Sequence, residues 1–334
     1  MTEASGELLG TIRSLGLIRP EESVALTPLN GGVSSDIWKV DAGARSFVVK
    51  RALPKLRVAA DWHAPVERNR YEAEWLRAVA SLLPGTAPRV LAFDADAGLF
   101  AMEYFQPSQY PVWKSELLRG RVDAQFAAEV GRRLAAIHSG TALDEKVKRS
   151  FATGNIFHAL RLEPYLEATA ARHPAVADRL LALSRTILAT RLALVHGDVS
   201  PKNILAGPSG PVFLDAECAW FGDPAFDLAF CLNHLLLKCL AVPTSARELL
   251  AAYYALAQAY TAGVDWESRT LLESRAARIL PALFLARVDG KSPVEYIDSE
   301  ADRDAVRMTA LPLIAEPPSS VGTVASAWAG RLRL

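Results

Sequence analysis

Cysteine is scarce in this sequence of 334 residues. Its three cysteines, Cys218, Cys231 and Cys239, form no Cys-x-x-Cys pair, and no histidine spacing suggests a metal site. An odd number of thiols in apolar surroundings supports neither structural zinc nor a disulfide framework. We therefore expect all three to be buried thiols of the core.

Net charge and a basic targeting signal are also missing. The 37 Lys and Arg residues balance 37 Asp and Glu residues, which gives no electrostatic reason to expect nucleic acid or an anionic membrane as the main partner. The N-terminus carries acidic residues where a signal peptide needs basic ones, and no apolar run suggests a membrane span. We expect a cytoplasmic protein, monomeric or homodimeric, without a nucleic-acid or membrane partner.

Apolar residues are plentiful at 51%, and the chain is long enough for two lobes with separate cores. Residues 24–50 alternate around glycine turns and predict an antiparallel β-meander, whereas residues 66–83 predict one helix. Two further strands are predicted over residues 90–93 and 99–104. A Gln-Pro-Ser stretch then breaks the pattern, so we place the lobe boundary after residue 105.

The C-terminal lobe, residues 106–334, is predicted to be larger and mainly helical. Amphipathic stretches bounded by proline, glycine or polar clusters predict helices over residues 123–138, 174–190, 224–240, 246–262 and 266–287. Two short strands are predicted around Ile204-Leu205 and Val212-Phe213-Leu214. After Pro312 the chain is richer in Pro, Ser and Gly, and we expect a loosely packed tail. The pattern as a whole is that of an α+β protein.

A glycine turn lies between the first two predicted strands. Its small residues, Gly31, Gly32, Ser34 and Ser35, would let backbone N–H groups approach a phosphate closely, although an ordinary hairpin has the same pattern. Lys50 ends an apolar strand that should bring it beneath this turn, where it would hold phosphate oxygens. The alternative for Lys50 is a solvated strand end.

Lys50 needs an anionic partner to stay in place, and the predicted helix offers Glu72 and Glu74. The two lie on different helix faces, so only one can reach the lysine. We favour Glu72 because its neighbours Trp75 and Leu76 mark the packed side, whereas Glu74 should meet water. A solvated position is the alternative for both glutamates.

The most informative stretch covers residues 195–205 and the two acids that follow it. Asp198 lies in a loop between apolar runs and is predicted to orient a substrate hydroxyl. Asn203 and Asp215 carry oxygens that suit magnesium, and Glu217, on the same side as Asp215, is predicted as a further ligand. A metal-assisted phosphoryl transfer requires residues of these kinds.

Other polar residues near this stretch are predicted to be structural. We expect His196 to be a hydrogen-bonded scaffold, since Asp198 already fills the role of base, and His138 to be structural as well. Asp223 precedes a proline at a helix start and should cap that helix. Asp227 either hydrogen-bonds the catalytic loop or is a plain surface acid.

In this order, the residues resemble the aminoglycoside phosphotransferase and choline kinase superfamily, whose members phosphorylate small molecules. The resemblance covers about residues 26–240. It implies a bilobal, protein-kinase-like fold, ATP and Mg2+ as cofactors, and Asp198 as catalytic base. It also implies that the backbone of Glu103 and Phe105 holds the adenine and that Met102 lines its pocket.

The chain departs from typical protein kinases at several positions. Gly197 stands where they have arginine, Ser200 stands where they have lysine, and no Ala-Pro-Glu follows the metal motif. Regulation by activation-loop phosphorylation is therefore not expected. The Asp-Ala-Glu triplet at 215–217, followed by Trp-Phe-Gly at 220–222, resembles methylthioribose kinases in particular, although it also occurs in other small-molecule kinases.

The sequence says less about the acceptor. Acids and bases are nearly balanced from Gly222 onward, which favours a neutral or weakly charged hydroxyl compound such as a sugar. The acidic run at 295–304 would suit a polycationic aminoglycoside, with a solvated helix face as the alternative. The polar residues 287–292 either reach the acceptor or cap a helix.

We predict an ATP-dependent phosphotransferase that moves the γ-phosphate to a hydroxyl of a sugar, amino alcohol or aminoglycoside-like molecule. A catalytically silent nucleotide-binding module is one alternative, but such modules usually lose a catalytic position, and Lys50, Asp198, Asn203 and Asp215 are all present. A protein kinase is a second alternative, and the departures just described count against it.

Overall fold

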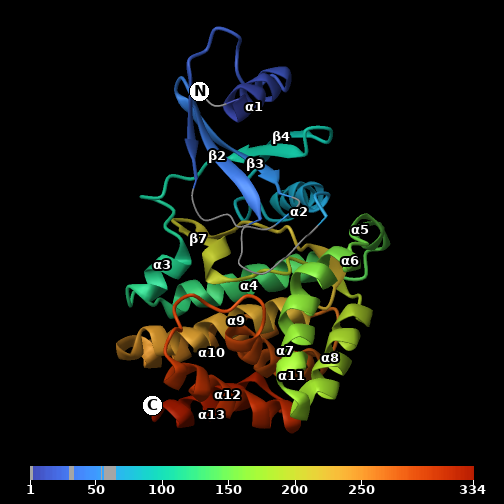
Figure 1. Cartoon of the computed structure of the whole chain (residues 1–334), viewed down its shortest axis with the longest axis vertical. Coiled ribbons are helices and arrows are strands. Elements are labelled where there is room, and N and C mark those ends of the chain that lie inside the picture. The colour runs from blue at the N-terminus through green and yellow to red at the C-terminus, as the bar shows by residue number, and fades with distance from the viewer. Residues whose placement is uncertain (1–2, 30–33, 54, 56–64) are drawn as a thin grey trace. The chain divides into compact units, whose positions relative to one another are not determined.

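The computed structural model describes residues 3–29, 34–53, 55 and 65–334. The chain divides into two compact units, Met1–Gln106 (unit 1) and Pro107–Leu334 (unit 2). The boundary predicted from the sequence, after residue 105, lies one residue earlier. Each unit has its own secondary structure, labelled in Figure 1.

Unit 1 is built on a five-stranded antiparallel sheet with strand order β1-β2-β3-β5-β4. The strands are β1 (Val24–Pro28), β2 (Ser35–Ala42), β3 (Arg45–Ala52), β4 (Val90–Asp94) and β5 (Leu99–Glu103). The first three pair in chain order, which confirms the predicted meander, and β4 and β5 confirm the two further strands.

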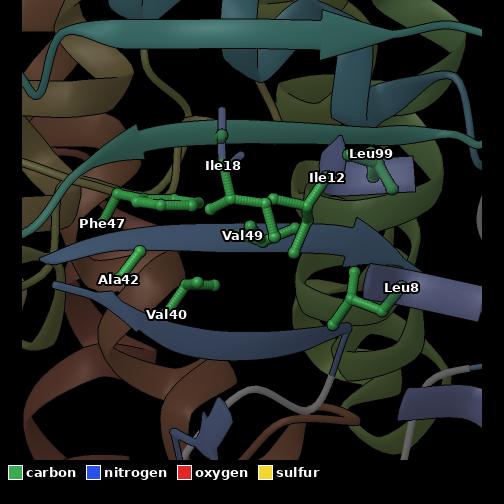
Figure 2. Close-up of a cluster of buried hydrophobic side chains, with 9 residues drawn as sticks. Leu8, Ile12, Ile18, Val40, Ala42, Phe47, Val49 and Leu99 are labelled. Atoms are coloured by element: carbon green, nitrogen blue, oxygen red, sulfur yellow. The ribbon is translucent and has the colours of Figure 1, made fainter. Parts of the chain in front are cut away.

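Two helices cover the sheet of unit 1, where the sequence predicted one. The unpredicted helix α1 (Glu3–Ser14) places Leu8 and Ile12 against sheet residues that include Val40 and Val49, as Figure 2 shows. Successive side chains of a strand point to opposite faces. Lys50, next to Val49, therefore lies on the other face, which packs against helix α2 (Arg68–Leu82).

Unit 2 is mainly helical, and all five helices predicted from periodicity are present: α10 has the predicted ends, and the other four differ at one or both ends. Its longer helices are α4 (Ala124–Thr141), α8 (Ala177–Ala189), α9 (Pro224–Ala241), α10 (Ala246–Ala262), α11 (Arg269–Asp289), α12 (Glu300–Ala315) and α13 (Val321–Leu332). The shorter ones are α3 (Trp113–Leu118), α5 (Glu145–Ser150), α6 (Gly154–Phe157), the π-helix η1 (His158–Glu167), α7 (Ala168–Arg172), and the 3₁₀ turns η2 (Pro174–Val176), η3 (Pro201–Asn203) and η4 (Pro243–Ser245).

Two small antiparallel ladders carry the central motif of unit 2. Strands β7 (Ile204–Gly207) and β8 (Gly210–Phe213), both predicted from the sequence, pair with each other. A second ladder that the sequence did not predict pairs β6 (Ala193–Val195) with β9 (Trp220–Gly222). The two ladders fix both ends of the loop that carries Asp198.

Helix α9 forms the centre of unit 2. By length and composition it is the one helix within the described residues apolar enough to cross a membrane, but 89% of its apolar window is buried inside the protein. It packs against α10 and α11. The apolar surface of α9 is therefore explained by core packing, and its free cysteines Cys231 and Cys239 are buried, as is Cys218.

The expectation of a loosely packed tail after Pro312 is wrong. Helix α13 buries Trp328 completely, and the indole N–H donates to the Leu236 carbonyl of α9 at 2.9 Å. The Trp328 ring also meets Phe284 of α11 edge to face, with ring centres 4.8 Å apart. Proline and glycine in this segment mark helix ends, and the apolar spacing of Val321, Val324 and Trp328 decides the packing.

Candidate active site

In unit 1 the predicted lysine and glutamate form a buried ion pair. Lys50 Nζ lies 2.8 and 2.6 Å from the two carboxylate oxygens of Glu72, and both residues are at most 2% exposed. Glu74 instead pairs with Arg70 on the helix surface at 2.7 Å. The preference for Glu72 is confirmed, and the solvated alternative for Lys50 is wrong.

The buried pair positions a charge more than it stabilises the fold, because desolvation offsets most of the attraction between two buried ions. Its surroundings are fixed by hydrogen bonds from the start of α2. Arg68 donates to the carbonyls of Ser34 and Leu53, both at 2.6 Å, and Asn69 donates to the Gly98 carbonyl at 2.7 Å. These bonds tie the helix that bears the glutamate to the strands that bear the lysine.

The predicted glycine turn is described only in part. Gly31 and Gly32 lie outside the described residues. Ser34 and Ser35 are buried, and the Ser35 hydroxyl has no hydrogen-bond partner in the part of the chain that the structure describes. A buried hydroxyl without a partner is costly unless a ligand satisfies it.

The residues predicted to contact adenine lie at the end of β5. Met102 is buried opposite Val48 of β3, and Glu103 ends the strand. The Glu103 N–H donates to the Arg89 carbonyl at 2.9 Å, so an adenine contact from the Glu103 backbone can involve only its carbonyl. Phe105 follows and is half-buried.

In unit 2 the hairpin β7–β8 brings together the two residues predicted to hold magnesium. Asn203 ends the turn η3 just before β7, and its carbonyl accepts the Leu214 N–H at 2.8 Å. Asp215 comes next and has a left-handed backbone, with φ of 64°. Aspartate tolerates this conformation better than most residues.

Asp198 is held by three donors that converge on one carboxylate oxygen. Oδ2 lies 2.8 Å from Asn203 Nδ2, 2.8 Å from Arg161 Nη2 and 3.3 Å from Lys202 Nζ. Burial acts to raise the pKa of the Asp198 carboxyl, but the charges of Arg161 and Lys202 outweigh it and hold the pKa below its ordinary value of 3.8. Asp198 is therefore ionised at neutral pH.

Arg161 is a site residue that the sequence did not reveal. It comes from η1, is 5% exposed, and donates from Nε to the Gly197 carbonyl at 2.7 Å as well as pairing with Asp198. Its guanidinium also lies over the rings of Tyr165 and Phe230. The signal was a single arginine between Leu160 and Leu162, a charge on an otherwise apolar helix face.

His196 and Asp227 form the scaffold of the loop. The Asp227 carboxylate accepts the backbone N–H groups of His196 at 2.7 Å and Gly197 at 2.8 Å, and it is fully buried, so the surface alternative for Asp227 is wrong. His196 Nε2 donates to the Leu214 carbonyl at 3.0 Å, while Nδ1 accepts the Asp198 N–H at 3.1 Å. Burial lowers the pKa of His196, so the ring is neutral, as this pattern requires.

The other two predicted structural residues also have internal partners. His138 lies 2.7 Å from the Tyr260 hydroxyl and 3.3 Å from Asp227. Asp223 caps α9 by accepting the Ala225 N–H at 3.0 Å, and it pairs with Arg275 at 3.0 Å. The predicted cap is confirmed.

Within the described residues no group of three or more His, Cys, Asp or Glu side chains could hold a metal ion, so a magnesium ion here would also need the Asn203 amide and oxygens from phosphate or water. Asn203 Nδ2 donates to both the carbonyl and the carboxylate of Asp198, which leaves the Asn203 Oδ1 without a hydrogen bond from the described residues. Asp215 lies beside it across the hairpin, and Glu217 is 6% exposed two residues on. Mg2+ usually takes one or two protein carboxylates and completes its shell with substrate phosphates and water.

The chain is similar to known small-molecule kinases. The model of the phosphotransferase enzyme family matches residues 25–272. The methylthioribose kinase of Pectobacterium atrosepticum is 28% identical over 256 residues, covering 68% of this chain and 64% of that protein. That of Yersinia pseudotuberculosis is 25% identical, covering 67% and 61%. The chain thus spans less than two thirds of the length of these relatives.

Solved structures show the same fold. An ethanolamine kinase of Plasmodium vivax has a TM-score of 0.54 at 14% identity, covering 96% of this chain and 86% of that one. An amicoumacin kinase has a TM-score of 0.53 at 13% identity, covering 96% and 98%. The predicted protein-kinase-like α+β fold is confirmed. Since the family model covers most of the chain, this protein belongs to the phosphotransferase enzyme family.

Proposed function

We propose that this chain is a kinase that transfers the γ-phosphate of ATP to a hydroxyl group of a small molecule. The observation that carries the proposal is the environment of Asp198: a buried, ionised carboxylate on a loop whose backbone is fixed by Asp227 and His196. The buried Lys50–Glu72 pair of unit 1 supports it as a phosphate-binding group. The named activities of the relatives are all of this chemical type.

Asp198 would accept a hydrogen bond from the acceptor hydroxyl and aim its oxygen at the γ-phosphorus. As the new O–P bond forms, the bond between the γ-phosphorus and the β,γ-bridging oxygen breaks, ADP leaves, and the hydroxyl proton passes by way of Asp198 to solvent. A carboxylate of low pKa is a weak base. Its main contribution would be orientation, which is what a loose phosphoryl-transfer transition state needs most.

The remaining predicted residues would bind the nucleotide. Lys50 would hold phosphate oxygens, with the turn that includes Gly31, Gly32, Ser34 and Ser35 around them. Bound magnesium, held by Asn203 and Asp215 with Glu217 as a further ligand, would neutralise charge on the phosphates. The backbone of Glu103 and Phe105 and the side chain of Met102 would contact the adenine.

Two alternatives remain, a silent nucleotide-binding module and a protein kinase. Unit 1 keeps the lysine, and unit 2 keeps the loop aspartate and the proposed magnesium ligands, which favours an active enzyme. Gly197 is packed against Cys218 in a way that leaves no room for the arginine of protein kinases, which favours a small acceptor. Methylthioribose belongs in any acceptor panel because it is the substrate named for the relatives.

The test is an ATP-consumption screen over sugars, including methylthioribose, amino alcohols, nucleoside breakdown products and aminoglycosides, with generic protein substrates in parallel. The variant Asp198→Asn should bind MgATP normally and lose at least about 100-fold in kcat. Asparagine is preferable to alanine here, because it keeps a hydrogen-bonding group beside Arg161. Full turnover by Asp198→Asn would contradict the mechanism, and labelling of proteins alone would favour the protein kinase.

A further inference from the structure

A second group of buried polar side chains lies in unit 2, and no step of the proposed reaction uses it. It consists of His234 and Lys238 from α9, Arg287 from α11, and Tyr296 from the loop after α11; we call it the α9–α11 cluster. The Tyr296 hydroxyl lies 3.5 Å from His234 Nδ1 and 3.5 Å from Lys238 Nζ. Lys238 Nζ is also 4.9 Å from the centre of the Tyr296 ring.

Two aromatic rings connect this cluster to the ion-pair partner of the catalytic carboxylate. The Arg161 guanidinium lies 5.8 Å from the centre of the Phe230 ring, and that ring is 5.4 Å from the ring of His234. Arg161 lies 5.7 Å from the Tyr165 ring, whose hydroxyl accepts a hydrogen bond from Arg287 at 3.0 Å. A single aromatic ring, that of Phe230 or of Tyr165, therefore lies between Arg161 and the cluster.

The two cations of the cluster are not ion-paired within the described residues. Lys238 is 1% and Arg287 9% exposed, and within the described residues neither has a carboxylate at ion-pair distance. Glu295 is the acid that favours charge on Lys238, but it pairs with Lys114. Burial lowers the pKa of Lys238 to about 7, and the charge of Lys114 adds to the effect. A buried cation of this kind is costly until an anion meets it.

Hydrogen-bonding groups of the same cluster are also unsatisfied. Among the described residues, His234 Nε2 and Arg287 Nε are buried and have no hydrogen-bond partner, and neither does the Ser200 hydroxyl, two residues from Asp198. Arg287 Nε can only donate, so its missing partner is an acceptor atom. Buried polar atoms without partners are rare in folded proteins, and a ligand that supplies oxygen atoms explains several at once.

The other polar residues near the end of α11 are already occupied. Asp289 pairs with Arg307 at 2.7 Å and with His173 at 2.7 Å, and Lys291 pairs with Glu163. Arg287 donates from Nη1 to the Tyr165 hydroxyl and to the carbonyl and hydroxyl of Ser292, but within the described residues it has no ion-pair partner and its Nε has no acceptor, so its charge is the one left for an anion.

We propose that the α9–α11 cluster binds an oxyanion of the acceptor, so that the preferred acceptor is a hydroxyl compound bearing a carboxylate or a phosphate monoester. This inference rests on the proposed function and names its substrate class. Lys238 and Arg287 supply the charge, His234 and Tyr296 supply further hydrogen bonds, and the hydroxyl of the same molecule meets Asp198. The cluster disfavours amino alcohols and aminoglycosides, because their ammonium groups would meet Lys238 and Arg287.

Two matched series of probes separate these classes by charge on one skeleton. The three-carbon series is glycerate, glycerol 3-phosphate, glycerol and 3-aminopropane-1,2-diol; the six-carbon series is gluconate, glucose 6-phosphate, glucose and glucosamine. Binding is measured without ATP as the shift in Tm of the full chain, at an ionic strength matched with sodium chloride. An oxyanion in at least one series should raise Tm, because a ligand bound only by the native state stabilises it. Comparing the carboxylate with the phosphate monoester of that series shows which of the two oxyanions binds more tightly.

Variants of Lys238 test whether the cluster is the site. Lys238→Met should weaken binding of the oxyanion by about 10- to 100-fold, the effect expected for a charged hydrogen bond, and Lys238→Arg should restore part of it. The control Lys146→Met removes an exposed lysine of α5 and should bind the probe like the wild type. Without a probe, Lys238→Met should unfold at the same or a higher temperature, since an unbalanced buried charge is removed.

The inference is overturned if no oxyanion raises Tm beyond the salt control. It is also overturned if a neutral or cationic member of a series binds as tightly as the oxyanions, or if Lys238→Met binds the oxyanion as tightly as the wild type. ATP consumption with the same probes separates this inference from the proposed function. Oxyanion binding without phosphate transfer to any acceptor would contradict the proposed function alone. Transfer to glucose or glucosamine in preference to the oxyanions would contradict the α9–α11 cluster as acceptor site alone.

Discussion

Asp198 is unusual among the residues of the site because so much positive charge meets one of its oxygens. Arg161, Lys202 and Asn203 all reach Oδ2, and no donor is recorded on Oδ1 within the described residues. One oxygen is thereby fixed to the protein, and the other is the natural contact for the acceptor hydroxyl. These contacts make the Asp198 carboxylate a weaker base and fix its orientation.

Substitution of Arg161 by methionine should make the site sensitive to acid. Burial by itself would raise the pKa of Asp198, and among the charges that lower this pKa that of Arg161 has the largest effect. Without Arg161 we expect the acid limb of the pH profile of kcat/KM to move up by about 1 to 2 pH units. The profile of the wild type should stay flat down to about pH 5, because Asp198 is ionised there.

Arg161→Lys is the control for this substitution, because it retains the charge. A profile of Arg161→Met that coincides with that of Arg161→Lys would contradict the assigned role.

The direction in which pH changes the stability of the fold through Asp198 also follows from its lowered pKa. A carboxylate with a depressed folded-state pKa stabilises the fold above its unfolded pKa of about 4, and this contribution disappears as the pH falls through the folded value.

We expect substitution of Asp215 to weaken binding of MgATP but not binding of ATP without the metal. Asp215→Asn retains a residue that tolerates φ of 64° and removes a charge that Mg2+ would use. We expect the affinity for MgATP to fall by at least about tenfold, with ATP affinity in EDTA unchanged, both measured by calorimetry. Asp178→Asn, an exposed acid of α8, is the control. Unchanged MgATP affinity of Asp215→Asn would show that the ion is held elsewhere.

Among the elements, the loop between β6 and η3 depends on one glycine. Gly197 has φ of 78°, and a Cβ atom there would lie 2.7 Å from the Cys218 carbonyl oxygen and 2.8 Å from the Cys218 Cβ. Side chains other than hydrogen are therefore excluded by backbone conformation and by space. The packing of Cys218 thus accounts for the glycine that stands where protein kinases have arginine.

Gly197→Ala should displace this loop. We expect the free energy of unfolding to fall by about 1–3 kcal/mol from strain alone, and kcat to fall because Asp198 moves with the loop. Urea unfolding and the ATP-consumption assay measure the two effects. Gly330→Ala in α13 is the control, because no atom lies within 4 Å of its added Cβ, and it should be neutral or slightly stabilising. A fully active, fully stable Gly197→Ala would contradict the packing argument.

The element η1 shows why part of the site escapes prediction from the sequence. Lys50, Asp198, Asn203 and Asp215 are recognisable because each belongs to a short motif with neighbours of the right type. Arg161 and Lys238 are single basic residues in apolar helices, and they join the other residues only through contacts distant in the sequence. A π-helix with an internal proline, Pro164, also lacks the regular 3.6-residue period that reveals a helix.

At the scale of the whole molecule, the two units have separate cores. Leu8, Ile12 and the sheet residues of Figure 2 make one of them, and α9 with α10, α11 and α13 makes another. Composition misled the prediction for the last segment, because the prolines between α12 and α13 and the two glycines within α13 resemble a disordered tail. Apolar spacing was the better guide, and it also accounts for α1, which the prediction omitted.

Because the two units have separate cores, we expect a substitution that destabilises one unit to leave the stability of the other unchanged. Ile12→Ala should remove hydrogen-exchange protection within residues 3–106, and Trp328→Ala should do so within 107–334, each by about 2–5 kcal/mol of local stability. Peptide-resolved hydrogen exchange with mass spectrometry measures both. Loss of protection throughout the chain in either variant would show that the units unfold as one.

The three buried thiols give this protein a set of internal reporters. Burial raises the pKa of Cys218 well above its ordinary value and removes the side chain from solvent, so an alkylating reagent meets neither a thiolate nor a path. Cys218 packs against Gly197, so opening of the loop that carries Asp198 would uncover it. We expect the rate at which Cys218 is alkylated to rise when that loop opens more often.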